Sequence, residues 1–182
     1  ARAKAALMSG WNDAVDERLY VAVVEGRLPA AEGILEGWLD ASDPYRVRMA
    51  RPGQAGALKA ITRYRMLASG ARYSLVELSL ETGRRHQIRV QLAAAGCPVA
   101  GDPRYGAATD PLGRLCLQAS AIELRLPSET SPRRFESPPP AGFAGLAVLH
   151  AGDPGAAERD IAQIGIELAM AATDASLAIE GD

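Results

Sequence analysis

Apolar and polar residues alternate in several short runs along the chain, a pattern typical of strands with one buried and one solvated face. Turn-forming residues lie between the runs, such as Ser42-Asp43-Pro44 and Ser69-Gly70-Ala71. The pattern predicts strands at 18–24, 33–40, 45–50, 59–68, 72–81, 115–120 and 121–126, of which 59–68 and 72–81 form a hairpin.

A helical period of apolar residues begins after position 83. Positions 88, 92 and 95 lie at i, i+4 and i+7, and Gly96 follows as a helix stop. In such a helix Arg85 and Arg89 lie one turn apart, with His86 beside Arg89 at i+3. Their donors would then share a surface near the first turn, where a helix attracts anions.

Further helices are predicted at 1–10, 142–149 and 156–172. The fold class expected is therefore α+β, a mixed, mainly antiparallel β-sheet with packed helices. A chain of 182 residues suits one domain, which we place at 1–150. Residues 151–182 are predicted to form an acidic, alanine-rich tail helix, whose helical part at 156–172 follows a Gly- and Pro-containing linker at 152–155.

Charge divides the chain at the same place. Residues 1–150 hold 19 Lys and Arg against 15 Asp and Glu, a net charge of +4, whereas residues 151–182 hold one arginine against seven acids, a net charge of −6. Of the cations in 1–150, 17 are arginines, whose guanidinium groups bind phosphate oxygens in pairs. The basic body fits a nucleic-acid partner, although a genome that favours arginine and alanine would give the same charge.

Metal, disulfide and membrane chemistry find little support in the sequence. Cys97 and Cys116 lie far apart and suit small buried side chains in a reducing compartment. His86 and His150 are the two histidines, and no cluster has metal-ligand spacing, so we expect no metal. No apolar run approaches about 18 residues, and we expect a cytoplasmic protein without a membrane partner.

Two adjoining strings carry more specific information. T-G-R-x-H-Q-I-R at 82–89 is followed by G-x-P-V-x-G-D-x-x-Y-G at 96–106. Together they resemble the last conserved motif of the RluA-type pseudouridine synthases. The resemblance extends to ERLYVAVVEG at 17–26, to KAITRY at 59–64, and to the stretches 115–119 and 135–143, so that it spans residues 1–147.

The resemblance implies an enzyme that converts specific uridines in ribosomal or transfer RNA to pseudouridine, without a cofactor and as a monomer. Tyr20 then stands at the position of an active-site tyrosine that stacks on the flipped base. Arg89 stands where an arginine pairs with the nucleophilic aspartate and keeps it ionised. Arg84, Arg85 and His86 are expected to hold flanking phosphates.

The chain also departs from the family pattern. Gln91 and Gln118 replace usual histidines, and Arg85 occupies a variable position. The H-R-L-D-x-x-T-S-G motif, which carries the family's nucleophile, does not occur in the 182 residues. We therefore expect a domain that is incomplete at its N-terminus and inactive as it stands, with Asp102 ordering its loop rather than attacking the substrate.

Two consequences follow from the missing motif. Arg89 is expected to lack a carboxylate partner here, so that replacing it with methionine would be neutral or stabilising. The chain could also be a catalytically silent RNA-binding module, which needs the basic body and Tyr20 but no nucleophile. A structural domain without an RNA partner is the third interpretation.

Overall fold

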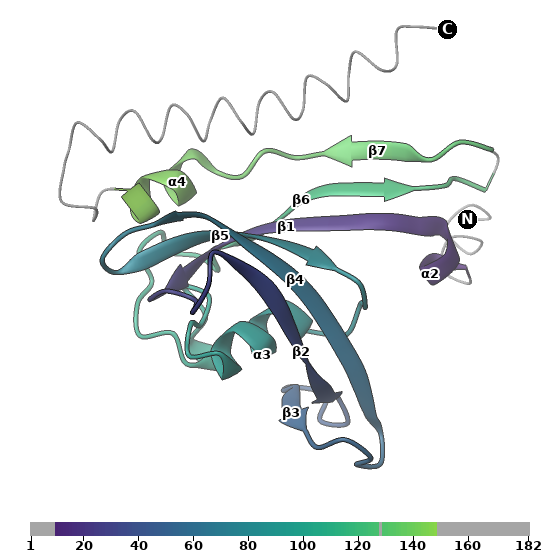
Figure 1. Ribbon diagram of the computed structural model, residues 1–182, viewed down its shortest axis with the longest axis horizontal. Coiled ribbons are helices and arrows are strands. Elements are labelled where there is room, and N and C mark those ends of the chain that lie inside the picture. Colours follow the sequence, from purple (N-terminus) through teal and green to yellow (C-terminus); the bar gives the residue numbers. More distant parts are fainter. Residues whose placement is uncertain (1–9, 128, 149–182) are drawn as a thin grey trace, which may run out of the picture.

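A single antiparallel sheet forms the frame of the protein in the computed structural model, which describes residues 10–127 and 129–148. Its strands are β1 (Val15–Glu25), β2 (Glu32–Asp40), β3 (Arg48–Ala50), β4 (Ala57–Ser69), β5 (Tyr73–Leu80), β6 (Leu117–Leu124) and β7 (Arg133–Glu136). Their order is β3-β2-β4-β5-β1-β6-β7, and every neighbouring pair is antiparallel (Figure 1).

The helices are short and lie outside the sheet. They are α2 (Trp11–Ala14), α3 (Gln87–Ala94), α4 (Ala141–Val148) and the 3-10 turn η1 (Pro103–Tyr105). Helix α3 packs on β2, β3 and β4, and α4 packs on β4, β5 and β1. The α+β class with an antiparallel sheet is confirmed.

Long alternating runs were predicted well, and the irregular segments were not. The hairpin of β4 and β5 pairs from Thr62↔Leu80 to Ser69↔Ser74, as expected. The two strands predicted at 115–126 are instead one strand, β6, and β7 pairs with it after residue 127. Strand β3 is shorter than predicted, because residues 41–47 form an anchored loop. Of the helix predicted at 1–10, only Gly10 is described, as a turn, and the helix predicted at 156–172 lies outside the described residues.

Two clusters of buried side chains hold the layers together. The larger joins the centre of β1 and β5 to α3 and α4, with Val21, Val76, Leu92 and Phe143 fully buried. The smaller lies under β2 and β3, where Leu39 and Val47 meet Tyr105. Removing this much apolar surface from water is the main force that fixes α3 against the sheet.

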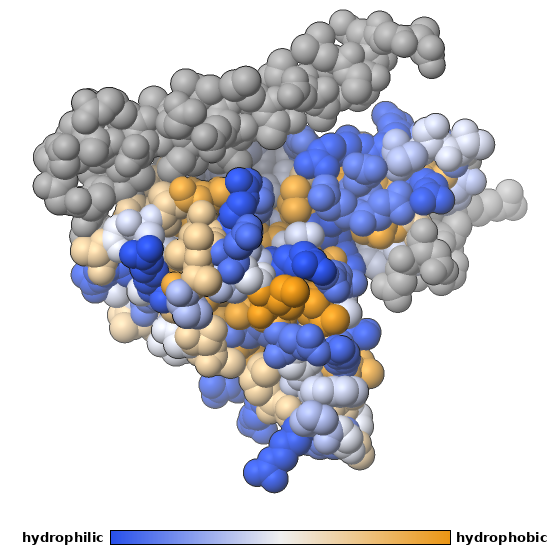
Figure 2. All heavy atoms as spheres, viewed as in Figure 1, coloured by the Kyte–Doolittle hydropathy of each residue, from blue (hydrophilic) through white to orange (hydrophobic). Residues whose placement is uncertain are grey.

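The face of the sheet opposite α3 is solvated where it carries Arg63 and Arg65 of β4. Ion pairs join neighbouring strands there, including Arg63–Glu81 at 2.5 Å and Arg65–Glu77 at 3.1 Å. Figure 2 shows an apolar strip between rows of hydrophilic side chains on the visible face of the molecule. Arg65 thus has a carboxylate partner on β5, and Arg63 has one on the residue that follows β5.

Cys97 and Cys116 are buried free thiols, and burial raises the pKa of both. Within residues 10–127 and 129–148, no three His, Cys, Asp or Glu side chains come close enough together to hold a metal ion. No helix in this part of the chain has the length and apolarity needed to cross a membrane.

Candidate functional site

The turn at 82–86 precedes α3 rather than forming its first turn. His86 has φ 54°, in the left-handed region that a β-carbon disfavours, and it caps the helix that begins at Gln87. The prediction that Arg85 and Arg89 lie one helical turn apart is therefore wrong. The helix stop was predicted correctly, because Gly96 has φ 78° just past the end of α3.

Side-chain amides hold the start of α3 on the sheet. The Gln87 Oε1 atom accepts hydrogen bonds from the Thr82 hydroxyl at 2.9 Å and from the Arg84 N–H at 3.0 Å. Its Nε2 donates to the Thr62 hydroxyl, which in turn donates to Gln91 Oε1 at 2.6 Å. All of these groups are satisfied, and such a buried network fixes one arrangement of the helix.

Arg89 forms a two-pronged ion pair with Asp102. Its Nε donates to Oδ2 and its Nη2 to Oδ1, each at 2.7 Å. The side chain of Asp102 is 1% exposed and that of Arg89 is 17% exposed. The hydrogen bonds that Arg89 donates to Asp102 raise the pKa of Arg89 above its usual value. The prediction that Arg89 lacks a carboxylate is wrong. The Asp102 side chain bonds to Arg89 and makes no capping bond in its own turn, so its role in ordering the loop stays a prediction.

Tyr105 connects this ion pair to its surroundings. Its hydroxyl accepts a hydrogen bond from the Val47 N–H at 3.1 Å and lies 2.8 Å from His86 Nδ1. The Arg89 guanidinium lies 4.8 Å from the centre of the ring. Burial, and then the positive charges nearby, lower the pKa of His86, which favours the neutral ring beside the Tyr105 hydroxyl.

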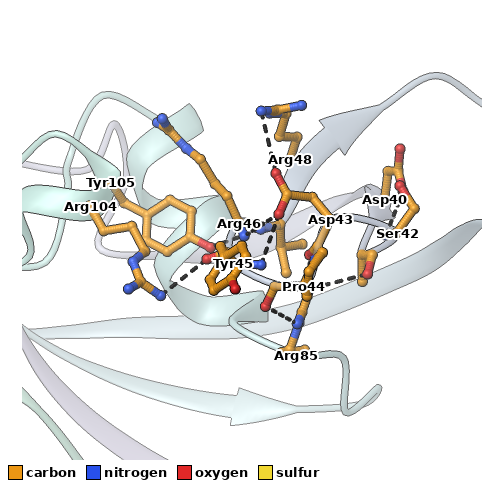
Figure 3. Close-up of polar contacts among 12 residues, drawn as sticks. Asp40, Ser42, Asp43, Pro44, Tyr45, Arg46, Arg48, Arg85, Arg104 and Tyr105 are labelled. Atoms are coloured by element: carbon orange, nitrogen blue, oxygen red, sulfur yellow. Dashed lines mark hydrogen bonds and ion pairs between the residues drawn. The ribbon is translucent and has the colours of Figure 1, made fainter.

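Arg84 and Arg85 are engaged with backbone carbonyls. Arg84 Nε donates to the Lys59 carbonyl at 3.1 Å. Arg85 donates to the carbonyls of Ala41, Asp43 and Pro44, with 2.6 Å to the last (Figure 3). Both side chains keep solvent exposure, but the main contact of Arg85 is the loop at 41–47.

Tyr20 lies on the same face of the sheet as α3. Residues paired across neighbouring strands share a face, and Tyr20 is paired with Leu78, which is paired in turn with Tyr64. Tyr64 and Thr62 are two residues apart on β4 and also share a face, and Thr62 contacts α3. The Tyr20 ring is half-buried against the larger cluster. Its hydroxyl reaches solvent and has no hydrogen-bond partner among the described residues.

A polar hollow of about 310 Å³ opens next to the row that contains Tyr20. It is lined by residues 15–18 of β1 and by residues 79–84. Arg18 crosses it and donates to the Leu80 carbonyl at 3.4 Å. Its guanidinium lies where a β-carbon at Gly83 would be, so a larger residue at 83 would displace the Arg18 side chain from this position.

Four of the five site residues predicted from sequence fall into two groups, and the fifth, Arg85, binds the 41–47 loop. Arg89 and His86 meet at Tyr105, whereas Tyr20 lies near the hollow, to which Arg84 also contributes. Arg18 and Tyr105 were not predicted. Both had a signal in the sequence, because Arg18 lies two residues before Tyr20 in the 17–26 string and Tyr105 is the tyrosine of G-D-x-x-Y-G.

Residues 4–94, half of the chain, match the RNA pseudouridylate synthase family. The chain belongs to this family. It is 40% identical over 134 residues to the uncharacterized RNA pseudouridine synthase YhcT of Bacillus subtilis. It is 39% identical over 139 residues to ribosomal large subunit pseudouridine synthase D of Nitrosomonas europaea. Each match covers 71% of this chain but only 43% and 40% of the relative.

Solved structures agree on the fold. Human RNA Pseudouridylate Synthase Domain Containing 1 superimposes with a TM-score of 0.60 at 23% identity, over 75% of this chain and 59% of that one. Human RNA Pseudouridylate Synthase Domain Containing 4 superimposes with a TM-score of 0.57 at 22% identity. The antiparallel sheet with its few helices is thus the fold of the family.

Proposed function

We propose that the chain forms the substrate-holding part of an RNA pseudouridine synthase that isomerises specific uridines in ribosomal or transfer RNA, in the cytoplasm and without a cofactor. The observation that carries the proposal is the family match over residues 4–94. A relative named for the large ribosomal subunit supports RNA as substrate.

The reaction breaks the bond between N1 of uracil and C1′ of ribose, joins C5 to C1′, and releases the proton from C5. Tyr20 would hold the flipped base, because it is only partly buried, its hydroxyl has no partner among the described residues, and it lies beside the polar hollow. A stacked ring replaces part of the base stacking that is lost when a nucleotide leaves its helix.

Arg89 would orient the nucleophilic carboxylate. The Nε and Nη2 atoms of Arg89 donate to Asp102, which leaves the Nη1 atom of Arg89 for a second carboxylate. Asp102 itself makes a poor nucleophile, because it is 1% exposed and both of its oxygens accept from Arg89. The nucleophile is then an aspartate of the H-R-L-D type, which the 182 residues do not contain. As given, the chain would bind RNA but not isomerise uridine.

Phosphate contacts would come from Arg84 and His86, which border the hollow and the Tyr105 cluster. Arg85 would act through the 41–47 loop that it holds.

Release of tritium from RNA labelled at C5 of uridine tests the proposal, since C5 loses its hydrogen in the reaction. The chain as given and a form extended by an H-R-L-D-x-x-T-S-G segment are compared on ribosomal and transfer RNA. We expect release from the extended form only. Release from the 182-residue chain would show that it contains its own nucleophile, and the proposal of an absent one would be wrong.

A silent RNA-binding module is the alternative function. The burial and full pairing of Asp102 favour it for the 182 residues alone. It predicts salt-dependent RNA binding with no tritium release from either form.

A further inference from the structure

We propose that Tyr45 and the arginines around it form a stacking site for an unpaired RNA base, at the sheet edge formed by β3. The inference rests on the proposed function, because it requires an RNA partner. It concerns nucleotides beyond the target uridine, since Tyr45 lies on the loop between β2 and β3 rather than at the hollow.

Tyr45 is the most exposed large apolar side chain in the described part of the protein, at 78%. The tyrosines at 64, 73 and 105 are exposed by 4 to 7%. The Tyr45 ring therefore adds little to the core, and its side chain makes no hydrogen bond or ring contact with the described residues. A free aromatic face of this kind is what a base needs for stacking.

The loop that carries Tyr45 is fixed from several sides. Asp43 Oδ1 accepts from the N–H groups of Tyr45 and Arg46, at 2.8 and 3.2 Å. Arg104 donates to the Tyr45 carbonyl at 3.1 Å, and Arg85 donates to the carbonyl before it (Figure 3). Because the backbone is already ordered, stacking on Tyr45 costs little additional loop entropy.

The surroundings of the ring are basic. Figure 3 places Arg46, Arg48, Arg85 and Arg104 around this loop together with two aspartates, which gives a net charge of +2. Arg48 is 68% exposed, and its ion pair with Asp43 is long, at 3.6 Å. Such an exposed pair is weak and can be exchanged for a phosphate. An aromatic ring beside exposed guanidinium groups is the pattern that binds single-stranded RNA.

The contacts also give Arg85 a specific role. It spans the family motif and the 41–47 loop, so it sets the position of Tyr45 relative to the turn that precedes α3. Arg85 is thus a positioning residue, and its effect on RNA depends on Tyr45.

Binding of a fluorescein-labelled oligouridine of about 12 nucleotides, a length typical of single-stranded sites, tests the site by anisotropy. Tyr45→Ala should weaken binding by about 5-fold or more, and Tyr45→Phe by less than about 2-fold, because phenylalanine keeps the stacking face. Phe135→Ala is the matched control, since Phe135 is an exposed aromatic on β7, at the opposite edge of the sheet. It should leave binding unchanged.

A 5-iodouridine version of the same oligomer should form a photo-crosslink at Tyr45, identified by mass spectrometry. Arg85→Met alone should weaken binding of the oligouridine. Added to Tyr45→Ala, it should weaken binding no further than Tyr45→Ala does by itself. Additive losses would overturn the positioning role of Arg85.

Equal affinities for Tyr45→Ala, Phe135→Ala and the unchanged protein would overturn the stacking site. If ribosomal RNA still binds in that case, the proposed function stands. If the unchanged protein binds neither oligouridine nor ribosomal RNA, both proposals fail.

Discussion

Replacing Arg89 with methionine tests the ion pair that organises the site. The change removes two hydrogen bonds of 2.7 Å and leaves the carboxylate of Asp102, which is 1% exposed, without a partner. Breaking a buried pair in this way costs about 3 to 5 kcal/mol. Because Arg89 is 17% exposed and water can approach it, we expect the lower end, about 3 kcal/mol.

The other half of the pair should be less sensitive. In Asp102→Asn the amide oxygen still accepts from Arg89, and the remaining guanidinium reaches water, so a loss of about 1 to 2 kcal/mol is expected. Glu36→Gln is the control, because the Glu36–Lys59 pair is half exposed, at 55% and 49%. An exposed pair of this kind contributes about 0 to 1 kcal/mol.

Urea unfolding followed by circular dichroism measures all three changes. At this chain length, 3 kcal/mol corresponds to a drop in Tm of about 6 to 12 °C. A loss for Arg89→Met no larger than that for Glu36→Gln would refute the reasoning, because Asp102 would then not depend on Arg89. A larger loss for Asp102→Asn than for Arg89→Met would also contradict it.

Three further outcomes are expected. The pKa of His86 is lowered in the folded state, so stability should fall as the pH drops through about 6.5, where the unfolded chain gains the proton. His86→Gln should make the Tm depend less on pH between about pH 5 and 7. Gly101→Ala should lower the Tm more than Gly53→Ala, because both have positive φ but only a β-carbon at 101 would collide with the Arg114 carbonyl. Deleting residues 151–182 removes six net negative charges and should tighten RNA binding at low salt; an unchanged affinity in a titration would contradict this.

The sequence predicted those features that depend on local pattern. The alternation in β4 and β5 and the glycine at 96 are local signals, and both predictions were confirmed. The start of α3 could not be predicted, because it depends on the left-handed His86 and on the bonds that Gln87 makes to β4. Regular periodicity carries no information about such contacts.

The pairing of Arg89 with Asp102 was not predicted, and the catalytic and phosphate-binding roles of the site residues stay predictions. Arg89 and Asp102 were both singled out, yet they are 13 residues apart, and only the packing of η1 against α3 brings them together. The roles of Arg85 and Tyr45 were missed for the same reason. The hydrogen bonds from Arg85 to the 41–47 loop join residues more than 40 positions apart.

The central claim is that the α3 face of the sheet holds the target uridine at Tyr20. Its most direct test is the rate of tritium release from uridine-labelled ribosomal RNA in single turnover, with the extended form carrying Tyr20→Phe or Tyr20→Leu. Phenylalanine should keep most of the rate, whereas leucine, which cannot stack, should lower it by about 10-fold or more. A rate for Tyr20→Leu equal to that of the unchanged protein would contradict the claim.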